Sequence, residues 1–234
     1  TYGDWSSDVC SSDLLSAAGD FDWAAERLGL GEQAGAPYEA MTVPSPFALE
    51  RQMRTFVLDA EGDEAEAIAQ MVAALYREAR RNTLVLFTAH ERLRRAHQRL
   101  KTLLPKSAPL YAQDRDGPAG LLAERFRAER GAVLLGVASL WEGVDFPGEA
   151  LEVLVVARLP FSVPDDPVVE ARAERLRARG LEPFRHDAVP EAVMRFRQGV
   201  GRLIRRATDR GVLVVCDPRL ARASYRGQIG RAHV

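Results

Sequence analysis

The alternation of short apolar runs with helical segments constrains the fold of this chain more than any other feature. Thr83–Thr88 and Ala132–Ala138 are apolar runs with the length of buried strands, and Leu151–Leu159 and Val212–Cys216 are also expected to be strands. Segments whose apolar residues recur every three or four positions, as in a helix, separate these runs. Because both faces of such strands are apolar, helices are expected on both sides of the sheet. The pattern therefore predicts one doubly wound, mostly parallel α/β sheet.

The remaining elements are expected between and before these runs. Two further strands are expected at Arg54–Ala60 and Leu110–Gln113. The expected helices are Phe21–Leu30, Ala65–Arg80, His90–Leu104, Ala119–Arg130, Val168–Arg179 and Glu191–Arg205. In such sheets ligands bind beyond the carboxyl ends of the strands. The candidate working surface is therefore made by the loops after Phe87, Ala138, Leu159 and Cys216.

Composition narrows the class of protein. No run of about 18 apolar residues exists, which predicts that no segment spans a membrane. Two cysteines, Cys10 and Cys216, give no disulfide framework and suit a reducing cytoplasm. The four histidines have no metal-ligand spacing with either cysteine. The net charge of -1 gives no global attraction to nucleic acid, so any such binding would use a local patch.

The two ends of the chain are related to each other. Residues Asp8–Asp13 can be encoded by a DNA string whose reverse complement translates as Ile229–Val234. Inverted copies of one DNA string at both ends are typical of a sequencing adapter. We therefore expect residues 1–14 and 229–234 to be adapter-derived and the chain to be truncated on both sides.

The expected helix Glu191–Arg205 would present two different faces. One face is polar, because Gln198, Arg202 and Arg205 follow one another at spacings of four and three. The other face is apolar and would be buried against the sheet. Its members are Val193, Phe196, Val200 and Leu203.

Two glycines in the same segment suggest a close approach. Gly199 and Gly201 would each cost a helix about 1 kcal/mol relative to alanine. Forked guanidinium groups beside a surface of close approach suit the recognition of a polyphosphate. An arginine-rich face exposed to solvent is the alternative interpretation.

A loop at the end of a predicted strand carries a second unusual group of residues. Ser139–Gly148 reads Ser-Leu-Trp-Glu-Gly-Val-Asp-Phe-Pro-Gly. Glycine and proline are ordinary in a turn. Trp141 and Phe146, however, are costly in a loop unless they pack or stack.

These two segments together resemble motifs V and VI of superfamily 2 DNA helicases of the DinG/XPD type. The resemblance covers about residues 15 to 226, and four further segments match in the family's order. They are Ser45–Phe47, Leu84–Ala89 (motif IV), Arg158–Phe161 and Asp217–Leu220. The family often has serine and an aromatic residue where this chain has Ala89 and His90.

The resemblance implies two RecA-like motor domains with ATP and Mg²⁺ bound between them. This chain resembles the second domain, at residues 44–228, preceded at 15–43 by a remnant of the first domain and a linker. The first domain's Gly-Lys-Ser/Thr loop and Asp-Glu-Ala-His box are absent from this chain. The full-length protein could carry the family's iron–sulfur cluster, but this chain lacks the four cysteines that would bind it.

Matching residue by residue implies roles at the nucleotide. Arg205 would be the arginine finger at the γ-phosphate, and Arg202 and Gln198 would bind phosphate oxygens beside it. Such a finger contributes about 10³–10⁵ in rate. Gly143 and Asp145 would contact the nucleotide or relay its state to the DNA.

The same matching implies a track for single-stranded DNA. Thr88 and Ser139 would bind DNA phosphates, a contact without sequence preference. Trp141 would stack on bases. For Phe161, stacking on bases and packing in the core are equally open.

The implied function is the second motor domain of a cytoplasmic ATP-dependent DNA helicase in DNA repair or replication. On its own, this chain would not hydrolyse ATP. One alternative is a nucleotide-binding or interaction module without motor activity. Another, a dinucleotide-dependent Rossmann enzyme, lacks a Gly-x-Gly-x-x-Gly turn after any predicted strand.

Three smaller features complete the predictions. Asp166 and Pro167 are typical of a helix N-cap followed by proline in the first turn. Arg94, Arg95 and Arg99 would form a basic helix face, which either lines the DNA track or faces solvent. His90 and His97 are expected to be surface histidines.

Overall fold

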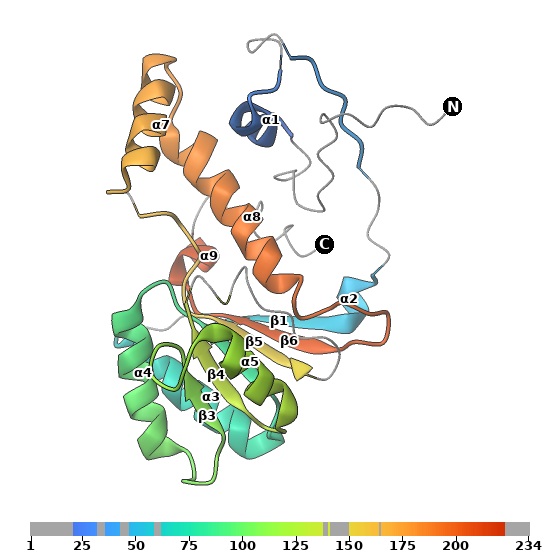
Figure 1. Ribbon diagram of the computed structural model, residues 1–234, viewed down its shortest axis with the longest axis vertical. Helices are drawn as coiled ribbons and strands as arrows, with labels where there is room; N and C mark the ends of the chain where they lie inside the picture. The colour runs from blue at the N-terminus through green and yellow to red at the C-terminus, as the bar shows by residue number, and fades with distance from the viewer. Residues whose placement is uncertain are drawn as a thin grey trace.

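Six strands form the sheet in the part of the chain that the computed structural model describes, which is residues 21–31, 36–42, 47–58, 62–137, 140, 150–163 and 165–222. The strands are β1 (Met53–Val57), β2 (Thr83–Leu86), β3 (Leu110–Ala112), β4 (Val133–Gly136), β5 (Val153–Val156) and β6 (Gly211–Val215). Their order across the sheet is β1-β6-β5-β2-β4-β3 (Figure 1). Every strand pair is parallel. The prediction of a mostly parallel sheet is confirmed.

The centre of the sheet lies entirely in the core. Strand β2 pairs with β4 on one side and with β5 on the other, so Leu84 lies opposite both Leu134 and Leu154. All residues of β2, β4 and β5 are buried, as continuous apolar runs require. Strand β1 forms one edge, and four of its five residues are exposed.

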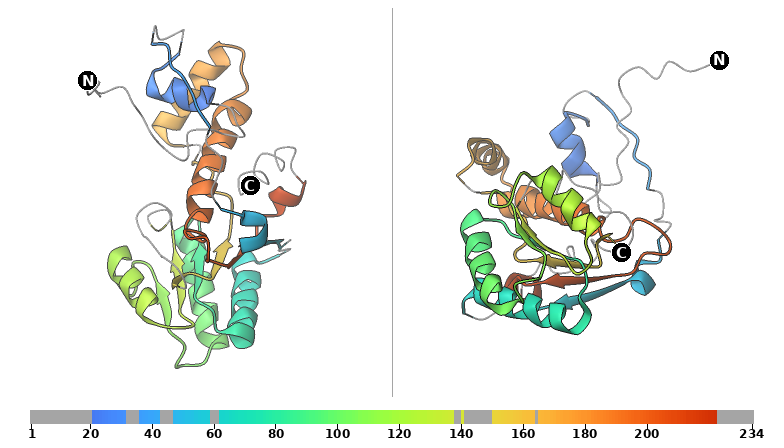
Figure 2. Two further views of the ribbon diagram at one scale, coloured as in Figure 1. Left: turned by 90° about the vertical axis from the view of Figure 1, so that its right-hand side faces the viewer. Right: turned by 60° about the horizontal axis from the view of Figure 1, so that its bottom comes forward.

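Helices cover both faces of the sheet, as Figure 2 shows. Helices α3 (Glu64–Ala79) and α4 (His90–Leu103) pack on one face through Ile68, Val72, Leu93 and Leu100. Helices α5 (Ala119–Ala128) and α8 (Val189–Val200) pack on the other through Leu122, Phe126, Val193 and Phe196. The fold is therefore doubly wound, as predicted.

A smaller helical part lies beside the sheet and is joined to it by α8 (Figure 1). It consists of α1 (Asp22–Leu28), α7 (Pro167–Ala178), the π-helical turn η3 (Phe184–Ala188) and the start of α8. Arg27 of α1 holds it together, since its guanidinium binds Asp187 at 2.8 Å and Glu191 at 3.2 Å. The predicted cap is confirmed: the Asp166 carboxylate accepts the backbone N–H of Val168 at 2.8 Å.

Helix α8 ends five residues earlier than predicted. It stops at Val200, and the chain then turns instead of continuing to Arg205. Gly199 lies in the last turn and Gly201 at the C-cap, and the backbone N–H groups of Arg205 and Arg206 bind the Asp209 carboxylate in place of helical carbonyls. Helix η3 and two short helices, α2 (Leu49–Gln52) and α9 (Pro218–Arg222), were not predicted.

Within the described residues, no helix combines the length and the apolar character that a membrane span needs.

Candidate functional site

The structure describes four of the eight predicted site residues. Ser139, Trp141, Gly143 and Asp145 lie outside the described residues. The other four are Thr88, Gln198, Arg202 and Arg205.

Gln198, Arg202 and Arg205 do not share one helix face, so that prediction is wrong. Gln198 lies in the last turn of α8, whereas the two arginines lie beyond the end of the helix. Arg202 is buried and Arg205 is exposed. The apolar half of the prediction holds, because Val193, Phe196, Val200 and Leu203 are all buried.

Gly201 fits the turn that ends α8. Its φ of -59° is ordinary for any residue, so the backbone angle does not require glycine. An added Cβ, however, would lie 3.2 Å from the carbonyl oxygen of Arg197. The glycine therefore gives room for the tight turn that brings Arg202 and Arg205 off the helix.

The turn that carries Arg205 has a defined backbone. The Asp209 carboxylate accepts the N–H groups of Arg205 and Arg206, both at 2.8 Å. From α2, the Gln52 side-chain amide donates to the carbonyl oxygen of Arg206 at 2.8 Å. The turn leads directly into Gly211, the first residue of β6, so it lies at the amino end of the sheet.

Thr88 lies at the opposite end of the sheet. It follows the last residues of β2 and is exposed just beyond the carboxyl end of that strand. Strands of four to five residues span about 13–17 Å at roughly 3.3 Å per residue. The structure therefore does not bring the predicted nucleotide-binding arginines and the predicted DNA-binding threonine together. They lie at opposite ends of the strands of one sheet.

Side-chain contacts of Asp217 and Arg219 join two loops at the carboxyl end of the sheet. Asp217, after β6, accepts the backbone N–H of Leu159, after β5, at 3.0 Å and the guanidinium of Arg219 at 2.6 Å. Burial acts to raise the pKa of Asp217, but the bonds from Arg219 and Leu159 hold it below its usual range. The Arg219 guanidinium lies 4.9 Å from the centre of the Phe161 ring.

Phe161 is half-buried, so it belongs to the core only in part. It packs partly against the core that includes α8, and its ring stacks on Phe184 of η3 at a centroid distance of 5.5 Å. Phe184 itself is 41% exposed.

The comparisons with known proteins decide the family. The family model described as "Helicase C-terminal domain" matches residues 72–232. The chain belongs to this helicase family. The resemblance to DinG/XPD-type helicases, predicted from motifs V and VI, is thereby confirmed.

Two curated relatives are similar over almost the whole chain. The protein named 3'-5' exonuclease DinG of Bacillus subtilis is 36% identical over 227 residues, which is 93% of this chain and 24% of the relative. The ATP-dependent DNA helicase YoaA of Escherichia coli is 35% identical over 228 residues, or 95% of this chain and 34% of the relative. This chain thus spans about a quarter to a third of the length of these relatives.

Solved structures of XPD share the fold. One described as an XPD helicase has a TM-score of 0.57 at 19% identity, covering 76% of this chain and 34% of the other. The Xpd4 structure from S. tokodaii also has a TM-score of 0.57 at 19% identity, covering 83% of this chain and 39% of the other. The RecA-like helicase fold is confirmed.

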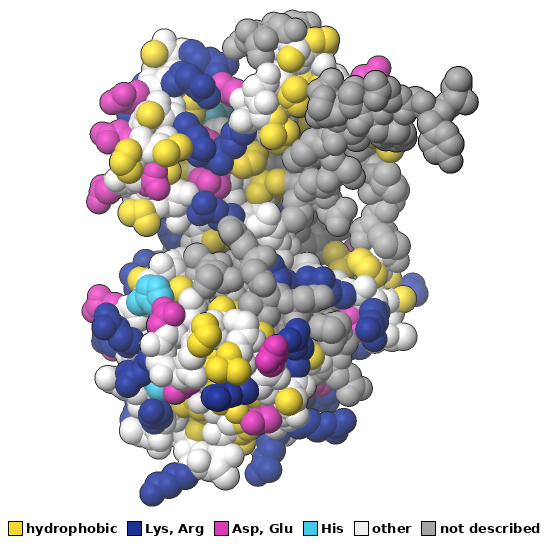
Figure 3. Space-filling view, viewed as in Figure 1, with side chains coloured by type: hydrophobic (Ala, Val, Ile, Leu, Met, Phe, Trp, Pro, Cys, Tyr) yellow, Lys and Arg dark blue, Asp and Glu magenta, His cyan; other side chains and the backbone are white. Residues whose placement is uncertain are grey.

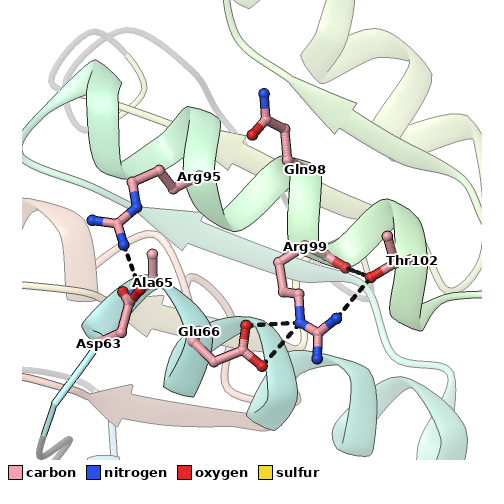
Figure 4. Close-up of a pocket in the computed structure, with 7 residues that line it drawn as sticks. All are labelled: Asp63, Ala65, Glu66, Arg95, Gln98, Arg99 and Thr102. Carbon is pink, nitrogen blue, oxygen red and sulfur yellow. Dashed lines mark hydrogen bonds and ion pairs between the residues drawn. The ribbon is translucent and has the colours of Figure 1, made fainter.

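In this helicase domain, Arg95 and Arg99 of α4 turn toward acidic residues at the N-cap and in the first turn of α3. Arg95 pairs with Asp63, and the Arg99 guanidinium binds Glu66 at 2.7 Å (Figure 4). Both arginines are neutralised by neighbours, which weakens the alternative that they line a DNA track. On the face seen in Figure 3, acidic side chains lie among the basic ones.

Three polar residues near the predicted sites, Glu64, Gln52 and Asp209, were not predicted from the sequence. The Glu64 carboxylate accepts Arg158 Nε at 2.6 Å and Arg92 at 3.3 Å, which ties the loop after β5 to α3 and α4. Gln52 and Asp209 fix the Arg205 turn. Only Asp209 had a signal in the sequence, because aspartate often accepts hydrogen bonds from backbone N–H groups a few residues away.

The described residues hold no group of three side chains that could bind a metal ion. Cys216 is buried, and burial raises the pKa of its thiol to about 12, so the thiolate that metals bind is disfavoured. His97 was expected at the surface, but it is buried on the inner side of α4.

Proposed function

We propose that residues 44–228 are the second motor domain of an ATP-dependent DNA helicase of the DinG/XPD type. Membership of the helicase C-terminal domain family supports this, as does the name of the E. coli relative. The observation that carries the proposal is the anchored turn after α8. It presents Arg205 at the surface with a backbone fixed by Asp209.

In the proposed mechanism, ATP is the substrate and lies between this domain and a first motor domain. Arg205 reaches the γ-phosphate and stabilises the negative charge that develops there during cleavage. Arg202 and Gln198 hold neighbouring phosphate oxygens. Gly143 and Asp145 contact the nucleotide or relay its state.

Mg²⁺ would neutralise charge on the β- and γ-phosphate oxygens when bound. In the proposed complex its protein ligands belong to the first motor domain, as the resemblance to the DinG/XPD-type helicases implies. An iron–sulfur cluster, if the whole protein carries one, would also have its ligands outside the described residues.

Single-stranded DNA would run across the carboxyl ends of the strands. There, Thr88 and Ser139 would bind phosphates, and Trp141 would stack on bases. Arg205 and Thr88 would thus contact the nucleotide and the DNA from opposite ends of the strands of one packed sheet. When the cleft between the two motor domains closes on ATP, a rotation of this domain would move its DNA-binding surface as a unit. Such a movement would couple ATP hydrolysis to stepping along the DNA.

Strand separation tests this proposal against a module without motor activity. The assay needs this chain joined to a first motor domain and a duplex with a 5′ single-stranded tail. We expect ATP-driven unwinding, its loss in Arg205→Ala, and its retention in the neighbouring control Arg206→Ala. ATP or DNA binding without turnover in the unsubstituted protein would instead identify the module.

A further inference from the structure

Two buried polar side chains hold the turn between α8 and β6 from opposite sides. On one side, the Asp209 carboxylate accepts the backbone N–H groups of Arg205 and Arg206 at 2.8 Å each. On the other, the Gln52 side-chain nitrogen donates to the carbonyl oxygens of Arg206 at 2.8 Å and Asp209 at 3.1 Å. Gln52 is 4% exposed and Asp209 is 8% exposed. Water therefore cannot easily replace either contact.

The sheet fixes the position of Gln52. It is the last residue of α2 and directly precedes Met53, the first residue of β1. Met53 lies opposite Gly211 in the parallel pair of β1 and β6. The segment that enters the domain and the turn that precedes β6 are therefore in register, and Gln52 connects them. Figure 1 shows α2 beside this turn.

Glutamine is suited to this place for a chemical reason. Its amide nitrogen carries two hydrogens, so it can donate to two carbonyl oxygens at once. A glutamate of the same shape has no hydrogen to donate when it is ionised. Asp209 plays the reciprocal part, because a carboxylate oxygen can accept two N–H groups.

We propose that Gln52 and Asp209 are positioning residues that fix the backbone of Arg205 for its contact with ATP, a role that rests on the proposed function above. Arginine has a long, flexible side chain, so the direction in which it leaves the backbone decides where its guanidinium can reach. A displacement of about 1 Å at a reacting centre can cost about 10² in rate. The two residues do not touch the substrate and act through Arg205.

Amide hydrogen exchange on this chain tests the contacts without reference to ATP. Asp209→Ala and Gln52→Ala are expected to increase exchange at the N–H groups of Arg205 and Arg206 by about tenfold or more, because the turn opens locally. The control Gln70→Ala replaces an exposed glutamine on α3 and should leave these two amides unchanged. Unchanged exchange in both test variants would overturn the proposal.

Steady-state ATP hydrolysis, in the protein that joins this chain to a first motor domain, tests the positioning role. Gln52→Ala and Gln52→Glu should lower kcat by about 10²-fold. KM for ATP and affinity for single-stranded DNA should stay within about twofold, because the lost contact is made only through Arg205. Asp209→Asn retains an oxygen acceptor and should keep more activity than Asp209→Ala.

The outcomes separate the two proposals. Faster exchange with unchanged kcat in the Gln52 variants would overturn the positioning role. A fall in apparent kcat that matches the loss of folded protein, so that kcat per folded molecule is unchanged, would do the same, because it indicates a merely structural contact. If Arg205→Ala itself leaves kcat unchanged, the proposed function fails, and the exchange result still reports on the turn.

Discussion

The carboxylate of Asp217 accepts the backbone N–H of Leu159 at 3.0 Å. This bond joins the loop after β6 to the loop after β5, two segments that the sheet brings together at its carboxyl end. Asp217 is 1% exposed and is paired with Arg219. A buried charge of this kind is stable only with such partners, so the contact orders the surface on which the proposed DNA track lies.

Asp217→Ala should lower the free energy of unfolding by about 2–3 kcal/mol, because Leu159 and Arg219 lose a buried acceptor. The pKa of Asp217 is lowered in the folded protein. The stability that its carboxylate contributes is therefore complete above the ordinary pKa of about 4, and it is lost as the pH falls through the pKa of the folded state. Urea unfolding at neutral and acidic pH measures both effects. The exposed control Asp165→Ala should change stability by less than about 0.5 kcal/mol, and a similar loss in both variants would contradict the account.

Gly136→Ala should destabilise the domain by about 1–3 kcal/mol, because an added Cβ at the end of β4 would overlap the Leu140 side chain. Gly120→Ala is the matched control: it lies in α5 with open space around it, so alanine should stabilise by roughly 0.5–1 kcal/mol. Thermal unfolding of both variants checks the prediction. Equal effects at the two positions would exclude close packing against Leu140 as the cause.

His97→Met should stabilise the fold by about 1 kcal/mol, since neither ring nitrogen of His97 has a hydrogen-bond partner among the described residues. Burial, and then the charge of Lys101, lowers the pKa of His97. The unfolded chain therefore takes up the proton first, and stability is lost as pH falls below about 6.5. Urea unfolding at pH values on both sides of that point should give a smaller pH dependence in the variant. An unaltered pH dependence would assign the effect to other groups.

The sequence predicted most of the elements because their signals are local. The periodicity of Ala65–Arg80 and the apolar run Thr83–Thr88 each lie within one element, and both agree with the structure within a few residues. Helix η3 and the short helix α2 have no such periodicity and were missed.

The end of α8 could not be read from local pattern. The apolar stripe continues to Leu203, which is buried, but the backbone of the next residues bonds to Asp209 instead of to the helix. The part played by Gln52 depends on the register of β1 and β6, whose residues are more than 150 positions apart. Such a contact exists only in the folded sheet.

Motif matching likewise could not predict that Thr88 and the Arg205 turn lie at opposite ends of the strands. Motifs name residues that act in one family of enzymes, but they do not say at which end of the sheet each residue lies. Here the topology places Thr88 after a strand and the Arg205 turn before one. This separation is the basis for expecting that nucleotide and DNA variants affect different measurements.

Single-turnover cleavage of ATP tests the central claim most directly, in the protein that joins this chain to a first motor domain. With the protein in excess over ATP, at a concentration that binds all of the nucleotide, and with single-stranded DNA present, Arg205→Ala should slow the cleavage step by about 10³–10⁵. Arg206→Ala, which removes a neighbouring exposed arginine, should slow it by less than about tenfold. A cleavage rate in Arg205→Ala that is equal to that of Arg206→Ala would contradict the account.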